Sequence, residues 1–339
     1  MTVPHTSELC KSINEAHARI LPHINRTPLE HSLILSNQTE CNVHLKLECE
    51  QVTGSFKARG AFNKLGICSN NAKSKQNYVT ASSGNHAMAC ALALSKLKQK
   101  GTVYVPNYIS EAKESYLKLY DIEVKKYGDD CLDTEKQARK MAEANDAVYI
   151  SPYADLEIVY GQGTVGKEIV EDLPNVDAIF VSVGGGGLIS GIGAYAKHQN
   201  SSIEIVGCSP SNSAVMQECV KAGEIIFIES LDTLSDGTAG GVEEGSITLP
   251  LCQKFVDKWV QVSEEEIAKA VYMILEKHHK MVEGSAGVAV AGFLKCKKDY
   301  IGKNVAIVIC GANISMEKLK FVIGSVETEN KSTASTNKH

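Results

Sequence analysis

One lysine, Lys57, stands among small and apolar residues that suit a reactive amine. The segment 54–61 reads GSFKARGA and runs directly into an apolar helical pattern. An amine enclosed by such residues loses the hydration of its charged form. Its pKa therefore falls, and it becomes a nucleophile suited to forming a Schiff base. The alternative is that Lys57 only begins a helix and points into water.

Small polar residues fill the segment 80–86, TASSGNH, between a predicted strand and a predicted helix. A turn of this kind places N–H groups, hydroxyls and an amide at the carboxyl end of a sheet, where open α/β sheets bind ligands. The alternative is that Ser82 or Ser83 caps the following helix and binds nothing.

Four consecutive glycines, Gly184, Gly185, Gly186 and Gly187, follow another predicted strand. Their backbone can wrap a phosphate, with the positive end of the next helix behind it. The run matches neither a P-loop nor the dinucleotide-binding fingerprint. A flexible connector is the alternative. Because four glycines cost conformational entropy unless something occupies the loop, we predict a phosphate site.

Two further segments carry groups that could meet the same ligand. Cys310 opens the segment CGAN after the last predicted strand, so its thiol is expected at the carboxyl end of that sheet. Glu283 opens the segment EGSAG, where a carboxylate stands beside small residues against which a flat ligand could pack. A C-terminal turn and a surface loop are the respective alternatives.

Strands and helices alternate along almost the whole chain and must position these groups. Strands rich in Val, Ile and Tyr are expected at 43–47, 78–81, 102–105, 123–126, 148–150, 178–183, 203–208 and 305–310. Helical patterns occupy 87–97, 110–119, 132–144, 163–171 and 264–280. The alternation predicts an α/β fold with parallel sheets. We expect a small domain over 77–150 inserted into a larger one of 1–76 and 151–326. The Ser-, Thr-, Asn- and Lys-rich tail 327–339 is expected to be disordered.

Composition narrows the class of protein. The 339 residues suffice for about two domains. A net charge of -5 and only four arginines argue against a nucleic-acid-binding surface. Eleven irregularly spaced cysteines predict core residues in a reducing compartment rather than a disulfide framework. No signal peptide is visible, and glycines interrupt the one uncharged stretch of membrane-spanning length, 178–196. We expect a cytoplasmic protein without membrane or nucleic-acid partners.

Four motifs, SFKARGA, SSGNH, GGGGL and CGAN, occur in this order along the chain. Together they resemble the motifs of the fold-type II pyridoxal-phosphate enzymes, in the branch of threonine/serine dehydratases and serine racemases. The resemblance extends from about Glu15 to Gly324. It implies an α/β fold like that of the tryptophan synthase β chain, with two open, parallel, twisted sheets. It also implies pyridoxal 5′-phosphate as the cofactor.

The resemblance implies a role for each candidate residue. Lys57 matches the lysine that binds the cofactor covalently and later acts as base on the substrate Cα. Phe56 would lie beside the cofactor ring, and Asn85 would hydrogen-bond its 3′-oxygen. The phosphate would be held by Gly184, Gly185, Gly186 and Gly187, and the substrate carboxylate by the N–H groups of Ser82, Ser83, Gly84, Asn85 and His86.

Cys310 matches the residue that faces the pyridine nitrogen of the cofactor. A neutral thiol cannot keep that nitrogen protonated, whereas an aspartate could. The ring is then a weaker electron sink, and expulsion of a β-hydroxyl competes better with a long-lived carbanion. Glu283 completes the expected cofactor-binding set.

Two departures bear on the reaction. Racemases of this family use a serine as the acid on the second face of the substrate, and Ser83 stands at that position. Eukaryotic serine racemases bind a divalent cation through acidic residues, but Ser209 and Val215 stand here where carboxylates are expected. We therefore predict no metal. The segment 234–241, LSDGTAGG, resembles bacterial-type threonine dehydratases.

The leading prediction is an ammonia-lyase that converts L-serine or L-threonine to a 2-oxo acid and ammonia by α,β-elimination. The alternatives are a serine racemase with side dehydratase activity and a 3-hydroxyaspartate or phenylserine dehydratase. A protein that binds the cofactor without turnover is the non-enzymatic alternative. The expected ligand is a small hydroxy amino acid, and the expected assembly is a homodimer.

Overall fold

The computed structural model describes residues 3–71, 77–107, 109, 111–129 and 131–336. Its larger sheet has six strands in the order β1-β2-β10-β7-β8-β9. All neighbouring pairs are parallel except β1 with β2. The strands of this sheet are β1 (Leu29–His31), β2 (Asn42–Lys46), β7 (Ala178–Ser182), β8 (Glu204–Pro210), β9 (Lys258–Val262) and β10 (Asn304–Val308).

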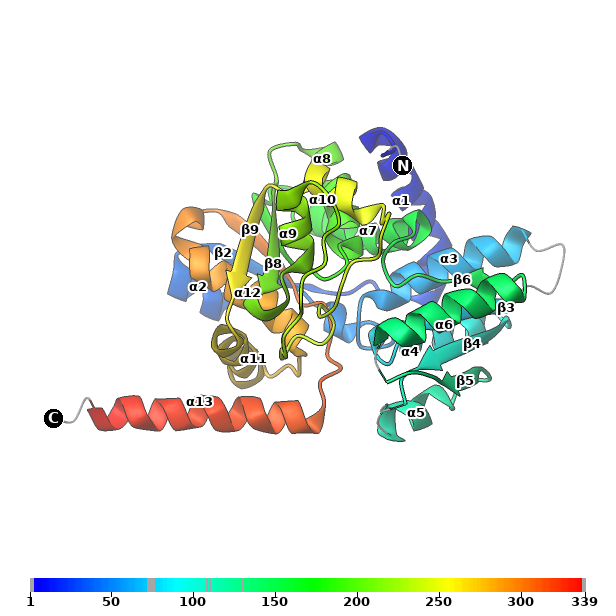
Figure 1. The fold of residues 1–339 in the computed structure, drawn as a ribbon. Coiled ribbons are helices and arrows are strands. Elements are labelled where there is room, and N and C mark those ends of the chain that lie inside the picture. The colour runs from blue at the N-terminus through cyan, green and yellow to red at the C-terminus, as the bar shows by residue number, and fades with distance from the viewer. Residues whose placement is uncertain (1–2, 72–76, 108, 110, 130, 337–339) are drawn as a thin grey trace.

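The smaller sheet is built from one continuous part of the chain. It has four parallel strands in the order β5-β4-β3-β6. Figure 1 shows it beside the larger sheet, with α3 and α4 nearby. The strands are β3 (Asn77–Ala81), β4 (Lys100–Val105), β5 (Glu123–Lys126) and β6 (Val148–Tyr149).

Helices cover both faces of each sheet, as parallel strands require. Their bounds are α1 (Thr6–Ile20), α2 (Leu33–Thr39), α3 (Lys57–Asn71), α4 (Asn85–Lys96), α5 (Glu111–Leu117), α6 (Cys131–Ala144), α7 (Leu156–Asp172), α8 (Gly187–Gln199), α9 (Val215–Ala222), α10 (Thr248–Phe255), α11 (Glu264–His278), α12 (Gly284–Cys296) and α13 (Met316–Thr336).

Successive residues of β8 show how the two faces are filled. A Cβ atom on Gly207 would lie 3.3 Å from Ile189 of α8, whereas Cys208 contacts Gly292 of α12. Side chains of a strand alternate between faces, so α8 and α12 lie on opposite sides of the sheet. Between these layers, Phe180 packs edge-on against Phe293 and Tyr300, with ring centroids 5.4 and 5.1 Å apart.

The α/β class and its parallel strands are confirmed. The sequence pattern did not predict two of the strands, β1 and β9, however. The strand β1 is too short to be recognised and runs antiparallel to β2, so the larger sheet is mixed. The strand β9 lies at the opposite edge, half-buried, and lacks the continuous apolar run that marks the central strands. The uncharged stretch 178–196 is β7, a glycine turn and α8.

The end of the chain differs from expectation. The helix α13 continues to Thr336, so residues 327–336, expected to be disordered, are helical. Buried Val322 and Val326 anchor the helix, whose main helical neighbour is α11. The segment beyond them contains neither glycine nor proline to end the helix. Figure 1 shows the helix extending away from the sheets. The expectation for residues 337–339 falls outside the described residues.

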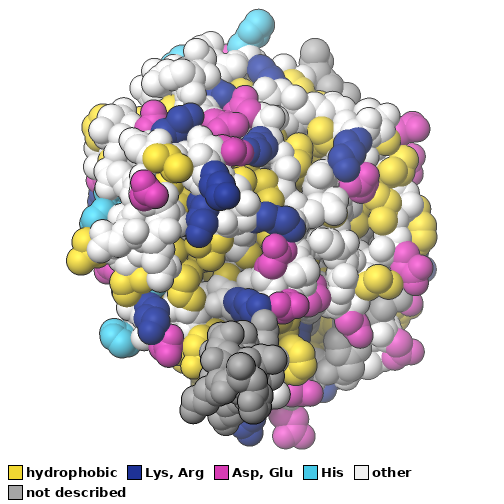
Figure 2. Space-filling view, turned by 90° about the vertical axis from the view of Figure 1, so that its left-hand side faces the viewer, with side chains coloured by type: hydrophobic (Ala, Val, Ile, Leu, Met, Phe, Trp, Pro, Cys, Tyr) yellow, Lys and Arg dark blue, Asp and Glu magenta, His cyan; other side chains and the backbone are white. Residues whose placement is uncertain are grey.

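Within the described ranges, no helix is both long and apolar enough to cross a membrane. On the face in Figure 2, lysines and arginines alternate with acidic side chains, and hydrophobic side chains are exposed between them.

Candidate active site

The amine of Lys57 is directed into the molecule. Lys57 is the first residue of α3, and its Nζ donates a hydrogen bond to the carbonyl oxygen of Pro152 at 2.8 Å. Desolvation lowers the pKa of Lys57 to about 8, although the neighbouring Cys90, Cys310 and Glu283 oppose the shift. The alternative that this residue only begins a helix and points into water is wrong.

The lowered pKa predicts how the amine reacts with an aldehyde. The rate at which pyridoxal phosphate, the cofactor that the resemblance implies, labels Lys57 in ligand-free protein should rise with pH and level off above about pH 8. The neutral amine is the nucleophile, and its fraction saturates once the pH exceeds the pKa. Stopped-flow absorbance across pH 6 to 11 measures this rate. A rise that continues to about pH 10.5, the ordinary lysine value, would contradict the lowered pKa.

Residues 82–84, called the serine-rich turn below, connect β3 to α4. They leave the first N–H groups of α4 without a capping side chain. The N-cap of α4 is Gly84, whose own N–H donates to Ser82 Oγ at 3.1 Å. The N–H of Ser82 donates to the carbonyl of Tyr104 at 3.1 Å, which fixes the turn to β4. The alternative that Ser82 or Ser83 caps this helix is wrong, and the helix end is able to bind an anion such as a carboxylate.

His86 is buried behind this turn. Its Nε2 lies 3.2 Å from the carbonyl oxygen of Ile150, and its ring lies within 3.5 Å of the Cys90 thiol. Burial, together with the charge of Lys57, lowers the pKa of His86 to about 3. The imidazole is therefore neutral near pH 7, and the part of this residue available to a substrate carboxylate is its backbone N–H.

The glycine loop is packed so tightly that side chains would not fit. A Cβ atom on Gly184 would lie 2.8 Å from the backbone of Thr238, and one on Gly186 would lie 2.8 Å from Cys252 Sγ. Gly186 also has a φ of 84°, in the left-handed region that favours glycine. No side chain caps the start of α8. The first N–H groups of this helix, at the end of the glycine loop, are therefore not bonded by a capping side chain. This cradle fits a phosphate.

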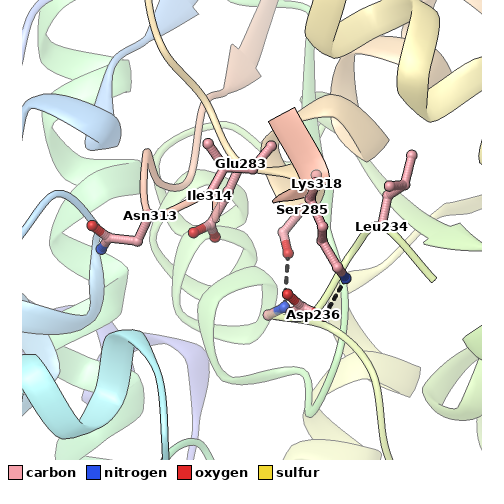
Figure 3. Close-up of a pocket in the computed structure, with 9 residues that line it drawn as sticks. Leu234, Asp236, Glu283, Ser285, Asn313, Ile314 and Lys318 are labelled. Carbon is pink, nitrogen blue, oxygen red and sulfur yellow. Dashed lines mark hydrogen bonds and ion pairs between the residues drawn. The ribbon is translucent and has the colours of Figure 1, made fainter. Parts of the chain in front are cut away.

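The side chain of Asn85 is held between two partners. Its Nδ2 donates to both carboxylate oxygens of Glu283, at 3.0 and 2.9 Å, and its Oδ1 accepts from Asn313 Nδ2 at 2.7 Å. Burial raises the pKa of Glu283. Figure 3 shows Glu283 and Asn313 beside a small pocket whose other wall includes Asp236 and Lys318.

Cys310 joins this group from the end of the larger sheet. The thiol is 2% exposed, lies 3.9 Å from Glu283 Oε1 and accepts from Ser182 Oγ at 3.5 Å. Burial and the nearby carboxylate raise its pKa well above the ordinary value, so the thiol is neutral. The backbone N–H of Phe56 donates to the Cys310 carbonyl at 3.2 Å, which brings the start of α3 to the same place.

A buried ion cluster anchors α3 two residues beyond Lys57. Arg59 donates to Glu48 at 2.7 and 2.8 Å and to Glu168 at 2.7 and 2.9 Å. Lys46 donates to Glu168 at 2.6 Å, and all four of these side chains are fully buried. Two positive and two negative groups balance, so the cluster holds the start of this helix in a fixed position.

The structure thus brings the predicted residues together. Phe56 bonds the Cys310 carbonyl, and the Asn85 amide bonds the Glu283 carboxylate. Lys57 bonds Pro152, and the next residue, Tyr153, packs on the glycine loop. Sequence reasoning missed Tyr153, whose ring covers Gly185. A signal was present: Tyr153 lies in the segment SPYAD, which follows a predicted strand as the other site turns do.

Comparisons with known proteins show the family to which this chain belongs. Residues 20–311 match the family model described as "Pyridoxal-phosphate dependent enzyme". The L-threonine ammonia-lyase of Thermotoga maritima is 37% identical over 92% of this chain and 77% of its own length. The structure of processed threonine deaminase isoform 2 from Solanum lycopersicum superposes with a TM-score of 0.87, at 30% identity over 95% of this chain and 94% of that one. Maize serine racemase superposes with a TM-score of 0.85, at 30% identity over 97% and 99% of the two chains. The chain therefore belongs to the family of pyridoxal-phosphate dependent enzymes.

Proposed function

We propose that this protein is a cytoplasmic, pyridoxal-phosphate dependent ammonia-lyase that converts L-threonine and L-serine to the 2-oxo acid and ammonia. The observation that carries the proposal is the placement of the Lys57 amine. It lies within reach of the segment that packs on the glycine loop, and close enough to lower the pKa of His86 behind the serine-rich turn. One amine therefore lies near a turn suited to a carboxylate and bonds the segment that packs on a loop suited to a phosphate. The name of the Thermotoga maritima relative supports the same reaction.

The residues fit the cofactor at each end. The N–H groups of Gly184 to Gly187 and the start of α8 would hold its phosphate. Phe56 would lie beside its ring, and Asn85 would hydrogen-bond its 3′-oxygen. The Cys310 thiol, neutral because it is buried, would face the ring nitrogen without protonating it. When bound, pyridoxal phosphate supplies an electron sink for the charge left at the substrate Cα.

The remaining steps fall to the protein's own groups. The N–H groups at the start of α4, from Ser83 to His86, would bind the substrate α-carboxylate and orient the Cα–H bond. Lys57 would take the Cα proton as a neutral amine, because burial has already lowered its pKa. The β-hydroxyl of the substrate then leaves with one proton as water, which balances the proton taken from Cα. Hydrolysis of the product enamine consumes one water and yields the 2-oxo acid and ammonia.

A substrate panel tests this proposal. Purified enzyme loaded with pyridoxal phosphate is incubated separately with L-threonine, L-serine and threo-3-hydroxyaspartate, and 2-oxo acid is measured in each. We expect 2-oxo acid from L-threonine and L-serine. Turnover of 3-hydroxyaspartate alone would overturn the proposed substrate class, and no product from any of the three would favour a cofactor-binding protein without turnover.

Racemisation is a second candidate function, and Ser83 is the observation that favours it. This serine is half-buried in the serine-rich turn, two residues before Asn85. It supplies a hydroxyl at the position where the racemases that this sequence resembles have their second acid. The similarity to maize serine racemase points the same way.

Ser83→Ala separates the two reactions. Elimination from L-serine needs only Lys57 and should keep at least about a tenth of its rate. Formation of D-serine needs a proton donor on the second face and should disappear. Chiral chromatography and a 2-oxo acid assay on the same samples measure both. If D-serine forms equally well with and without the hydroxyl, Ser83 is not the second acid.

The expected homodimer is part of the proposal. Val52, Met281 and Met316 are exposed by 39, 51 and 63%. Val52 precedes Thr53, whose carbonyl accepts a hydrogen bond from Asn313 at 2.9 Å, and Met316 follows Asn313 by three residues. Exposed apolar side chains near the site are what a second copy of the chain could cover. Light scattering of the purified protein gives the assembly directly, and a mass of one chain would contradict a homodimer.

A further inference from the structure

Tyr153 forms one wall of the glycine loop. A Cβ atom on Gly185 would overlap Cγ and both Cδ atoms of the Tyr153 ring, so the ring lies flat against this glycine. A Cβ atom on Gly187 would lie 3.2 Å from the backbone and Cβ of the same tyrosine. Tyr153 therefore contacts two of the four loop residues, including the first residue of α8.

The hydroxyl of Tyr153 is fixed from the opposite side. It accepts a hydrogen bond from the backbone N–H of Glu243 at 2.9 Å. Glu243 lies in the long irregular segment between α9 and α10, and its carboxylate accepts from Ser151 Oγ at 3.2 Å. Since Ser151 also accepts the N–H of Ala154 at 3.0 Å, both sides of Tyr153 in the chain are held.

Arg139 ties this arrangement to the smaller sheet. It comes from α6, forms an ion pair with Glu243, and lies 4.1 Å from the centre of the Tyr149 ring. Its guanidinium also pairs with Glu135 of the same helix at 3.0 Å. A continuous chain of contacts thus runs from α6 through Glu243 and Tyr153 to the glycine loop.

We propose that Tyr153 is a positioning residue for the phosphate of the cofactor, held in place by the Arg139–Glu243 ion pair. Four successive glycines would otherwise populate many backbone conformations, and few of them direct several N–H groups at one phosphate. The ring removes that freedom from one side of the loop. The inference depends on the cofactor of the family and not on the reaction, so its failure would leave the proposed ammonia-lyase activity standing.

A comparison of two ligands tests the proposal. Dissociation constants of pyridoxal 5′-phosphate and of pyridoxal, which lacks the phosphate, are measured by equilibrium dialysis with cofactor-free protein. Both ligands can bond covalently to Lys57, so the ratio of their constants isolates the phosphate contribution. In Tyr153→Ala, we expect affinity for pyridoxal phosphate to fall at least about tenfold, as for the loss of a charge-assisted contact. Affinity for pyridoxal should change less than about twofold.

Conservative variants keep the test decisive if Tyr153→Ala folds poorly. Tyr153→Phe retains the ring and loses only a neutral hydrogen bond, so it should weaken pyridoxal phosphate binding about threefold. Glu243→Ala removes the carboxylate that pairs with Arg139 and should also weaken pyridoxal phosphate binding about threefold. The matched control is Glu135→Gln, which alters the other partner of Arg139 and should leave the ratio unchanged. Equal losses for both ligands, or none for either, would overturn the proposal.

Discussion

Lys57→Ala should lower L-threonine turnover at least about a thousandfold, within the range for removal of a general base. The variant should also lack the visible absorbance band of the bound cofactor, because Lys57 is the amine expected to bond to it. Borohydride treatment followed by peptide mass spectrometry should place the pyridoxyl label on the peptide containing Lys57 in the unaltered protein. The variant should carry no label there.

Lys280→Ala is the control for this experiment. Lys280 is a partly exposed lysine that pairs with Glu50 at 2.7 Å and Glu30 at 3.3 Å. Its loss should leave both turnover and absorbance within about twofold of the original, since exposed ion pairs contribute little. A Lys57→Ala enzyme with full activity would contradict the assignment of the reactive amine.

Arg59→Met should cost about 3–5 kcal/mol of unfolding free energy, the range for removing one partner from a buried ion pair. Glu48 and Glu168 would lose the guanidinium that they share, Lys46 would still pair with Glu168, and the two carboxylates are fully buried. The shift of the urea unfolding midpoint, multiplied by the unchanged slope of the unfolding free energy against urea concentration, gives this free energy.

Arg26→Met is the matched comparison for Arg59. Arg26 pairs with Glu171 at 3.0 Å and Asp172 at 2.5 Å, but its side chain is 41% exposed. Solvent screens these pairs, so the loss should stay below about 1 kcal/mol. Equal losses for the two arginines would show that burial does not distinguish the clusters.

Much of the fold could be predicted because the central strands are buried on both faces. Strands such as β7 and β10 read as continuous apolar runs, and the turns that follow them are rich in Ser, Gly and Asn. Those turns gave the candidate residues their place at the carboxyl ends of the sheets. The edge strands β1 and β9 lack such runs because each pairs on one side only.

Contacts between distant parts of the chain could not be predicted. Glu48 and Glu168 meet at Arg59 across 120 positions of sequence, and each acid alone reads as an ordinary surface residue. Tyr153 likewise meets Gly185 and Glu243 only after folding. Local patterns report periodicity and turns, whereas these partners are chosen by the three-dimensional packing of both sheets.

The most direct test of the proposed ammonia-lyase is the stoichiometry of its products. Purified enzyme loaded with pyridoxal phosphate is incubated with L-threonine, and 2-oxobutanoate and ammonia are measured in the same samples over time. The proposed α,β-elimination predicts that both appear at equal rates while L-threonine disappears at that rate. Loss of L-threonine without formation of 2-oxobutanoate and ammonia would contradict the proposal. Conversion of L-threonine only to another stereoisomer of threonine would contradict it as well.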